Sequence, residues 1–128
     1  MRLLLDTHVL LWWLDGDFRL SSRARAAIAG RQALVFVSAA TAWEIATKFR
    51  VGKLPKAKDV ANDIPGCLAR EGFVEMPVKI AHGQRAGALP EIHKDPFDRM
   101  LVAQSLVEDL ALVSNERLFD RYGVERFW

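Results

Sequence analysis

Cysteine is almost absent from this chain of 128 residues, where Cys67 stands alone. A single cysteine excludes both an intrachain disulfide and a metal site built from several thiolates, which suits a reducing cytosol. No stretch approaches the roughly 20 consecutive apolar residues that a membrane helix needs. The apolar start is interrupted by Asp6 and His8 and lacks a small-residue cleavage site, so it is typical of folded structure and not of a signal peptide. We therefore expect a soluble, cytoplasmic protein without membrane contact.

A large net charge is also missing, since the formal value is only +2. With 51% hydrophobic and 27% charged residues, the composition is that of a globular protein, and the length predicts one domain over residues 1–128. The distribution of charge is more informative than its sum. If Asp6, Glu44, Asp98 and Glu116 converge, the rest of the chain carries 18 basic and 12 acidic residues. An acidic site in a basic surface is then expected.

Short apolar runs alternate with helical patterns along the whole chain. This alternation predicts an α/β fold with a mainly parallel central sheet and helices on both faces, because parallel neighbours need crossover connections. The expected strands cover residues 3–5, 33–37, 73–76, 111–113 and 124–127. The expected helices cover residues 9–14, 23–29, 40–50, 78–86, 97–109 and 116–122, with a broken helical segment at 56–71 around Pro65-Gly66.

Four acidic residues stand just after predicted strands or in the first turns of the helices that follow: Asp6, Glu44, Asp98 and Glu116, with Asp95 three residues before Asp98. In an open parallel sheet, ligands bind beyond the carboxyl ends of the strands. Each acid taken alone is explained as well by helix capping or by a favourable interaction with a helix dipole. Asp6 is harder to explain in this way, because a carboxylate beside a buried strand needs compensation.

Taken together, the carboxylates indicate a metal site. Several carboxylates held close together stay ionised only if a cation balances them. Oxygen ligands without cysteine or paired histidines favour Mg²⁺ or Mn²⁺ over zinc. Such a site polarises phosphate oxygens and lowers the pKa of bound water, so hydrolysis of a phosphodiester is the expected chemistry.

Four sequence blocks carry a resemblance to a known family. They are LLLDTHVLLW at residues 3–12, SAATAWEIATK at 38–48 followed by GKL at 52–54, HKDPFDRMLVAQS at 93–105, and LVSNERLF at 112–119. In order and spacing they resemble the PIN-domain proteins of the VapC toxin type. The resemblance implies a PIN-like three-layer α/β/α sandwich, a divalent-metal-dependent endoribonuclease, and the toxin half of a toxin–antitoxin pair that a protein antitoxin inhibits.

Carried over residue by residue, the family's acids fall on Asp6, Glu44 and Asp98, with an additional acid on Asp95. The fourth acid of the family, usually an aspartate, falls on Glu116, whose side chain is longer by one methylene. The resemblance therefore implies that Asp6, Glu44, Asp98 and Asp95 are catalytic and bind metal, and it puts the role of Glu116 as a metal ligand in doubt. Thr7 and Ser114 match hydroxyl positions beside the site, where they would orient acids or water, or else serve as ordinary turn and cap residues.

Other polar residues admit more than one interpretation. His8, His82 and His93 are too scattered for a zinc site and are assigned to the surface or to packing. The basic stretch from Lys48 to Lys58 would follow an RNA backbone or form a solvated face. Arg99 would neutralise a carboxylate or contact phosphate.

The segment Leu10–Leu14, with Trp12 and Trp13, is bulkier than a short helix buries on one side. It predicts a homodimer or antitoxin contact, with core packing as the alternative. Two other functions also remain open. Asp6 could serve as a phosphotransfer nucleophile, although no second aspartate follows two residues later. The acids could otherwise hold a metal in a binding module without nuclease activity.

Overall fold

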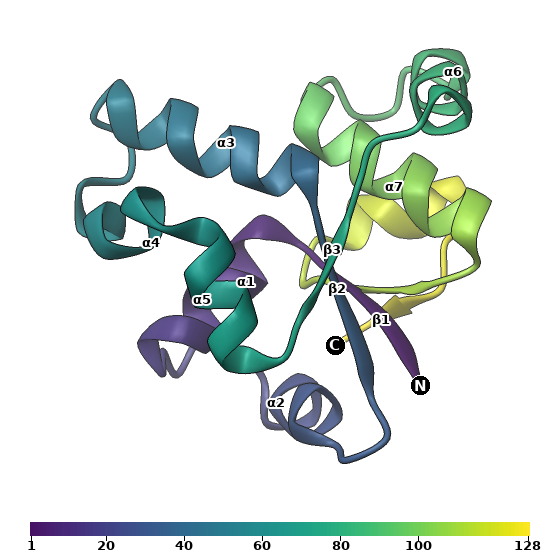
Figure 1. Cartoon of the computed structure of the whole chain (residues 1–128). Coiled ribbons are helices and arrows are strands. Elements are labelled where there is room, and N and C mark those ends of the chain that lie inside the picture. The colour runs from purple at the N-terminus through teal and green to yellow at the C-terminus, as the bar shows by residue number, and fades with distance from the viewer.

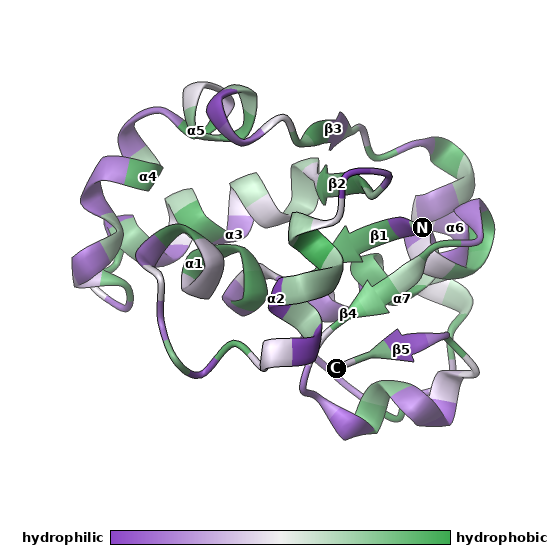
Figure 2. Cartoon of the chain, turned by 90° about the horizontal axis from the view of Figure 1, so that it is seen from below, coloured by the Kyte–Doolittle hydropathy of each residue, from purple (hydrophilic) through white to green (hydrophobic).

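The computed structural model describes residues 1–128, built around one five-stranded parallel sheet. The strands are β1 (Arg2–Leu5), β2 (Leu34–Ser38), β3 (Val74–Met76), β4 (Ala111–Val113) and β5 (Arg126–Phe127). They lie side by side in the order β3-β2-β1-β4-β5, which Figure 2 shows from below. Every neighbouring pair is parallel, so all carboxyl ends lie at the same edge of the sheet. The predicted α/β sandwich with a parallel sheet is confirmed.

Seven α-helices surround the sheet (Figure 1). They are α1 (Thr7–Asp15), α2 (Ser22–Ala29), α3 (Ala39–Arg50), α4 (Lys58–Asn62), α5 (Ile64–Glu71), α6 (Ile80–Ala88) and α7 (Pro96–Glu108). Two 3₁₀ helices, η1 (Pro55–Ala57) and η2 (Arg117–Tyr122), complete the chain. None of the helices combines the length and the apolar composition needed to cross a membrane.

The two faces of the sheet bury separate apolar cores. Successive residues of a strand point to opposite faces, and β1 shows this directly: Leu3 and Leu5 belong to one core and Leu4 to the other. The first core is closed by residues of α1, α2, α3 and α5, and the second by residues of α6, α7 and η2. Because β1 is buried on both faces, the residue that follows it is held rigidly.

Local sequence signals set most of the helix ends. Gly16 adopts a left-handed conformation with φ of 63° and ends α1, a position that favours glycine. Asp95 caps α7 through its side chain, and Pro96 occupies the first turn, where a missing N–H costs nothing. The predicted break before Pro65 is confirmed, since α4 ends at Asn62 and Asp63 caps α5.

Three predicted elements differ in detail. The helix expected from residue 78 begins at Ile80, because Val78 and Lys79 are extended and His82 accepts a hydrogen bond from the Lys79 N–H. The helix expected at 116–122 is a 3₁₀ helix, with Glu116 as its cap. The last strand is only Arg126–Phe127.

Of the two interpretations of Leu10–Leu14, the structure supports core packing, and an interface through this segment stays a prediction. Leu10 and Leu11 are buried, while Trp12, Trp13 and Leu14 pack against the first core. Large apolar side chains are exposed elsewhere, including Trp43 at 63% and Ile80 at 90%.

Candidate active site

Asp6 lies at the point where the order of the strands changes direction. The chain runs outward from β1 through β2 to β3, then crosses back to β4 on the other side of β1 and runs outward to β5 in the opposite direction. Such a switch point leaves an opening beyond the strand ends, where the ligands of parallel sheets bind. The Asp6 N–H donates to the Val113 carbonyl oxygen of β4 at 3.1 Å. Asp6 therefore stands at the edge of the sheet where a binding site is expected.

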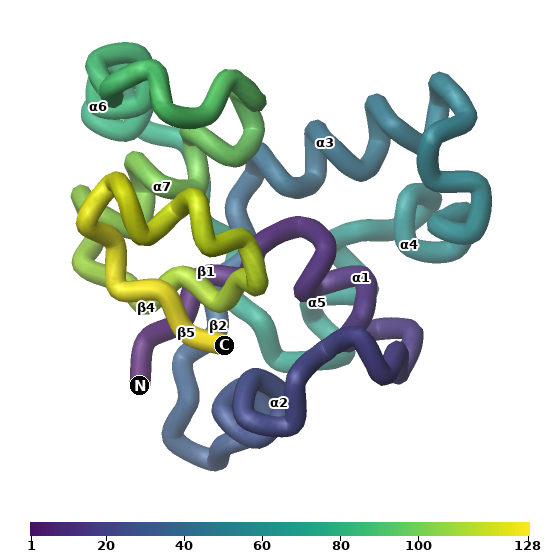
Figure 3. The backbone as a smooth tube through the Cα atoms, turned by 180° about the vertical axis from the view of Figure 1, so that it is seen from behind, coloured from purple at the N-terminus to yellow at the C-terminus, as the bar shows by residue number.

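The Asp6 carboxylate is buried, with 7% of the residue exposed. The Ser114 hydroxyl, just after β4, donates to it at 2.7 Å. Figure 3 shows the start of α1 passing beside the yellow-green segment that follows β4, which brings these two distant parts of the chain together. Burial and the nearby Glu44 charge raise the pKa of Asp6, while the Ser114 hydrogen bond and His8 oppose the rise.

Glu44 reaches the same region from α3 and is 3% exposed. The Thr7 hydroxyl donates to its Oε1 at 2.6 Å, and Lys48, one turn later on α3, forms an ion pair with its Oε2. Although desolvation of the ammonium acts in the other direction, the pKa of Lys48 is raised by Glu44, Asp95 and Asp98. The Lys48 ammonium is therefore a cation contributed by the protein to a group of acids.

Asp98 lies in the first turn of α7, and its side chain is 22% exposed. The His93 Nε2 is 2.7 Å from the Asp98 Oδ2. The Asp98 backbone N–H donates to the Asp95 carboxylate at 3.0 Å. Burial, together with the charges of Asp6 and Asp95, raises the pKa of Asp98 to about 7, although His93 opposes the rise. The Asp6 charge acts on Asp98, so the residue that follows β1 and the first turn of α7 lie in the same part of the molecule.

Glu116 differs from the other predicted acids. Glu116 is exposed, and its Oε1 accepts a hydrogen bond from the backbone N–H of Leu118, two residues later, at 3.0 Å. Its backbone N–H donates to the Ser114 hydroxyl at 3.0 Å. Glu116 thus adjoins the site through its backbone while its carboxylate caps η2, and its charge is not among the causes that shift the pKa of Asp6 or Asp98.

The donor set fits a divalent cation in its chemistry. Asp6, Glu44 and Asp98 supply only carboxylate oxygens, the ligands that Mg²⁺ and Mn²⁺ prefer. The raised pKa values of Asp6 and Asp98 show that the protein alone does not fully compensate their charges. In the present conformation no three His, Cys, Asp or Glu side chains are grouped so that one ion contacts all of them. Each of the three carboxylates binds a donor of the protein: Ser114 for Asp6, Lys48 for Glu44 and His93 for Asp98.

Comparison with known proteins identifies the family. The chain matches the PIN domain family over residues 3–125, which is nearly its whole length. The chain belongs to the PIN domain family. A further similarity, 42% identity over 48 residues, is to Ribonuclease VapC16 of Mycobacterium tuberculosis (strain ATCC 25618 / H37Rv). It covers 38% of this chain and 34% of that protein, so the match spans about a third of the relative's length.

Solved structures share the PIN fold of this chain. The crystal structure of VapBC2 from Rickettsia felis, bound to a DNA fragment from their promoter, aligns with a TM-score of 0.69 at 15% identity, over 95% of this chain and 93% of that one. A toxin–antitoxin complex from Klebsiella pneumoniae aligns with a TM-score of 0.62 at 19% identity, over 88% of this chain and 85% of that one. At such identities the likeness establishes the fold.

Sequence reasoning missed two residues of this PIN domain site. His93, assigned to the surface or to packing, contacts Asp98. Its position in the loop before α7 gave no periodic signal. Lys48, taken only as part of a basic stretch, pairs with Glu44, and the spacing of four residues on a predicted helix was a signal that could have revealed the pair.

Arg99 has a different role from either interpretation made from the sequence. Its guanidinium donates to the carbonyl oxygens of Ala86, Leu89, Pro90 and His93 at 2.8–3.1 Å. None of these hydrogen bonds is to a carboxylate. Arg99 therefore fixes the loop that carries His93, and through it the orientation of Asp98.

Proposed function

We propose that this PIN domain is a divalent-metal-dependent endoribonuclease that hydrolyses RNA phosphodiester bonds. The observation that carries the proposal is that three buried or half-buried acids from separate elements act on one another: Thr7, next to Asp6, donates to Glu44 at 2.6 Å, the Glu44 charge acts on Asp6, and the Asp6 charge acts on Asp98. Keeping several ionised carboxylates this close raises the free energy of the folded protein unless a cation binds between them. The similarity to a protein named as a ribonuclease supports RNA as the substrate.

In the proposed site, Asp6, Glu44, Asp98 and Asp95 hold Mg²⁺ or Mn²⁺. When bound, the metal supplies Lewis-acid polarisation of phosphate oxygens and a lowered pKa for water. The Ser114 and Thr7 hydroxyls orient Asp6 and Glu44, and His93 orients Asp98. The protein contributes position and charge, and no side chain is needed as a nucleophile. Glu116 is at most an outer member of the site, because its carboxylate caps η2.

Phosphotransfer through Asp6 is the less favoured alternative. Its carboxylate accepts a hydrogen bond from Ser114, is 7% exposed and faces Glu44, so an incoming phosphate would meet a second buried negative charge. A module that binds metal only for structure is distinguished by experiment. Metal would then raise the melting temperature without producing RNA cleavage.

We also propose that the protein is the toxin half of a toxin–antitoxin pair, acting in the cytoplasm and inhibited by a protein antitoxin. The support is the VapBC and toxin–antitoxin complexes among the similar structures. A homodimer is proposed as well, now through the exposed apolar face around Trp43 and not through Leu10–Leu14. The chain is proposed to function as one domain over residues 1–128.

The direct test of the proposed chemistry is an RNA cleavage assay with the purified protein. We expect cleavage with Mg²⁺ or Mn²⁺, loss of cleavage with EDTA, and recovery when the metal is restored, because the carboxylates supply no nucleophile of their own. The products are resolved on a denaturing gel. Cleavage that continues undiminished in EDTA, from protein freed of other nucleases, contradicts the proposal.

A further inference from the structure

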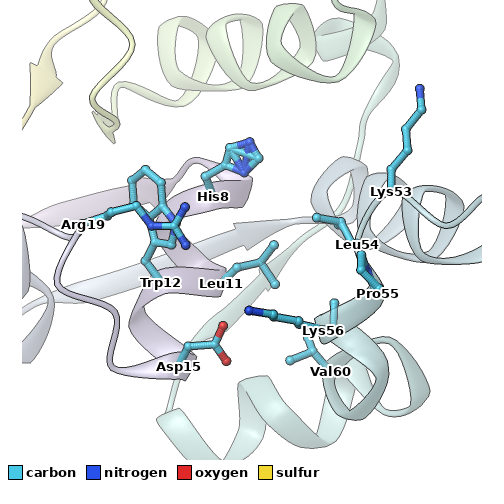
Figure 4. Close-up of a pocket in the computed structure, with 11 residues that line it drawn as sticks. His8, Leu11, Trp12, Asp15, Arg19, Lys53, Leu54, Pro55, Lys56 and Val60 are labelled. Carbon is cyan, nitrogen blue, oxygen red and sulfur yellow. The ribbon is translucent and has the colours of Figure 1, made fainter.

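A pocket of about 390 Å³ opens beside the acidic site, between α1 and the segment that runs from the end of α3 through η1 to α4. Figure 4 shows its two walls. His8, Trp12 and Arg19 form one wall, and Leu54 and Pro55 form the other. From the second wall, Lys56 extends across toward Asp15, and Lys53 points outward. The volume lies within the range of about 300–1,000 Å³ that is usual for small-ligand pockets.

One wall of the pocket is an aromatic stack. The rings of His8 and Trp12 are 5.9 Å apart at 23°, and the Arg19 guanidinium lies over the Trp12 ring at 5.3 Å. Asp17 holds Arg19 in place through two carboxylate oxygens, at 2.6 Å and 3.1 Å. Flat aromatic and guanidinium groups held in this way offer a surface on which any nucleobase can stack.

The opposite wall combines apolar and cationic groups. Leu54 and Pro55 face the aromatic wall, and the buried Leu11 lies between the walls. Lys53 and Lys56 are exposed, and Lys56 reaches across toward Asp15. Counting Arg19, three cations and one acid, Asp15, line the pocket. A ligand with a flat apolar body and negative charge is complementary to these walls, and a nucleotide has both.

The pocket and the acidic site lie near one another at the start of α1. His8 lies two residues after Asp6 and is close enough for its charge to act on the Asp6 carboxyl. A strand of nucleic acid whose phosphate reaches Asp6 would therefore place a neighbouring nucleotide at His8.

We propose that this pocket binds one unpaired nucleotide of the RNA substrate. The base lies between the His8–Trp12 stack and the Leu54-Pro55 wall, and the phosphates lie against Lys53 and Lys56. The subsite rests on the proposed ribonuclease function and extends it, because it selects single-stranded RNA and fixes which phosphate reaches the acids.

The test is a binding titration of a short single-stranded oligoribonucleotide in EDTA, repeated with an abasic site at each position in turn. Wild-type protein loses about tenfold in affinity when the base at one particular position is removed, the size expected for one stacked base. In His8→Ala, the same base removal has little effect, because the stacking wall is shortened. His8 is exposed, so this variant avoids the loss of core packing that Trp12→Ala would cause.

Lys53→Glu provides a second variant, with Arg31→Glu as its matched control. Arg31 is an exposed cation in the turn before β2, at the opposite edge of the sheet. We expect Lys53→Glu to weaken RNA binding by about tenfold, with a smaller salt dependence, and Arg31→Glu to bind like the wild type.

Metal-dependent cleavage of the same oligonucleotide, measured in parallel, separates the two proposals. If the wild type cuts RNA but no position is sensitive to base removal, or if His8→Ala keeps the full penalty, the subsite is wrong and the ribonuclease stands. The subsite is equally wrong if the pocket variants lose binding to a protein partner while their RNA affinity is unchanged. If the wild type neither binds nor cuts RNA, both proposals are wrong.

Discussion

Asp98 is a residue whose protonation depends strongly on its neighbours. Its pKa is raised to about 7 by burial, then by Asp6 and Asp95, against the opposing effect of His93. The folded protein therefore keeps this proton up to about pH 7, whereas the unfolded chain releases it near 3.8. Protonated Asp98 contributes its full stability below pH 3.8, and this stability is lost as the pH rises towards about 7.

This linkage predicts the behaviour of Asp98→Asn in EDTA. The amide keeps the shape of the protonated acid and cannot ionise, so the variant should melt several degrees above the wild type at pH 8, about 4 °C for each kcal/mol regained. At pH 5 the two proteins should melt at similar temperatures. Thermal denaturation followed by circular dichroism at the two pH values measures the difference. A variant that melts at or below the wild-type temperature at pH 8 would contradict the raised pKa.

At the scale of the element, patterns within short windows predicted most of the fold. The strand at residues 3–5 followed from a continuous apolar run, and the helix predicted at 97–109 differs from α7 by one residue at each end. The sequence could not show which side chains meet across elements. The contact of His93 with Asp98, and the four carbonyl oxygens held by Arg99, depend on a loop without periodicity.

Helix α1 shows why bulk alone misleads. The prediction of an exposed surface at Leu10–Leu14 assumed that a short helix buries one side only. In the fold, β1 places the start of α1 over the sheet, α2 and α5 pack nearby in the same core, and Trp128 from the chain end meets Trp12 at 6.0 Å. Similarly, the sequence identified Glu116 as an acid after a strand but could not show that its carboxylate caps η2.

At the scale of the whole molecule, one apolar face is left uncovered. Trp43 on α3 is 63% exposed and packs edge-on against Phe97 at 4.8 Å. Val78 and Met100 line the same hollow, which has a volume of about 510 Å³, and Ile80 follows at the start of α6. Contiguous exposed apolar surface of this kind is typical of protein interfaces. Two-fold association is the commonest way to bury it.

We therefore expect the free protein to be a homodimer at tens of micromolar, and Trp43→Glu to shift it to monomer, because a buried carboxylate at the interface lacks a partner. Sedimentation velocity measures both. Phe18→Ser is the matched control, since Phe18 is 92% exposed on the loop after α1 and away from this face. A wild-type monomer, or a Trp43→Glu dimer as stable as the wild type, would count against this interface.

The account as a whole depends on the carboxylates acting together at the strand ends. Asp6 is held at the end of a strand buried on both faces, and Asp98 is held in the first turn of α7. Substituting a metal ligand that is held rigidly causes the largest loss of activity. Glu116 is exposed and caps η2.

The most direct measurement is therefore the rate of metal-dependent RNA cleavage by Asp6→Asn, beside the wild type and the matched variant Glu116→Gln. Each substitution exchanges a carboxylate for its amide, and circular dichroism checks that both variants remain folded. We expect Asp6→Asn to lose at least about 100-fold in rate, the upper end of what outer-shell changes cost, and Glu116→Gln to keep most of its activity. A folded Asp6→Asn that cuts RNA at the wild-type rate would contradict the account.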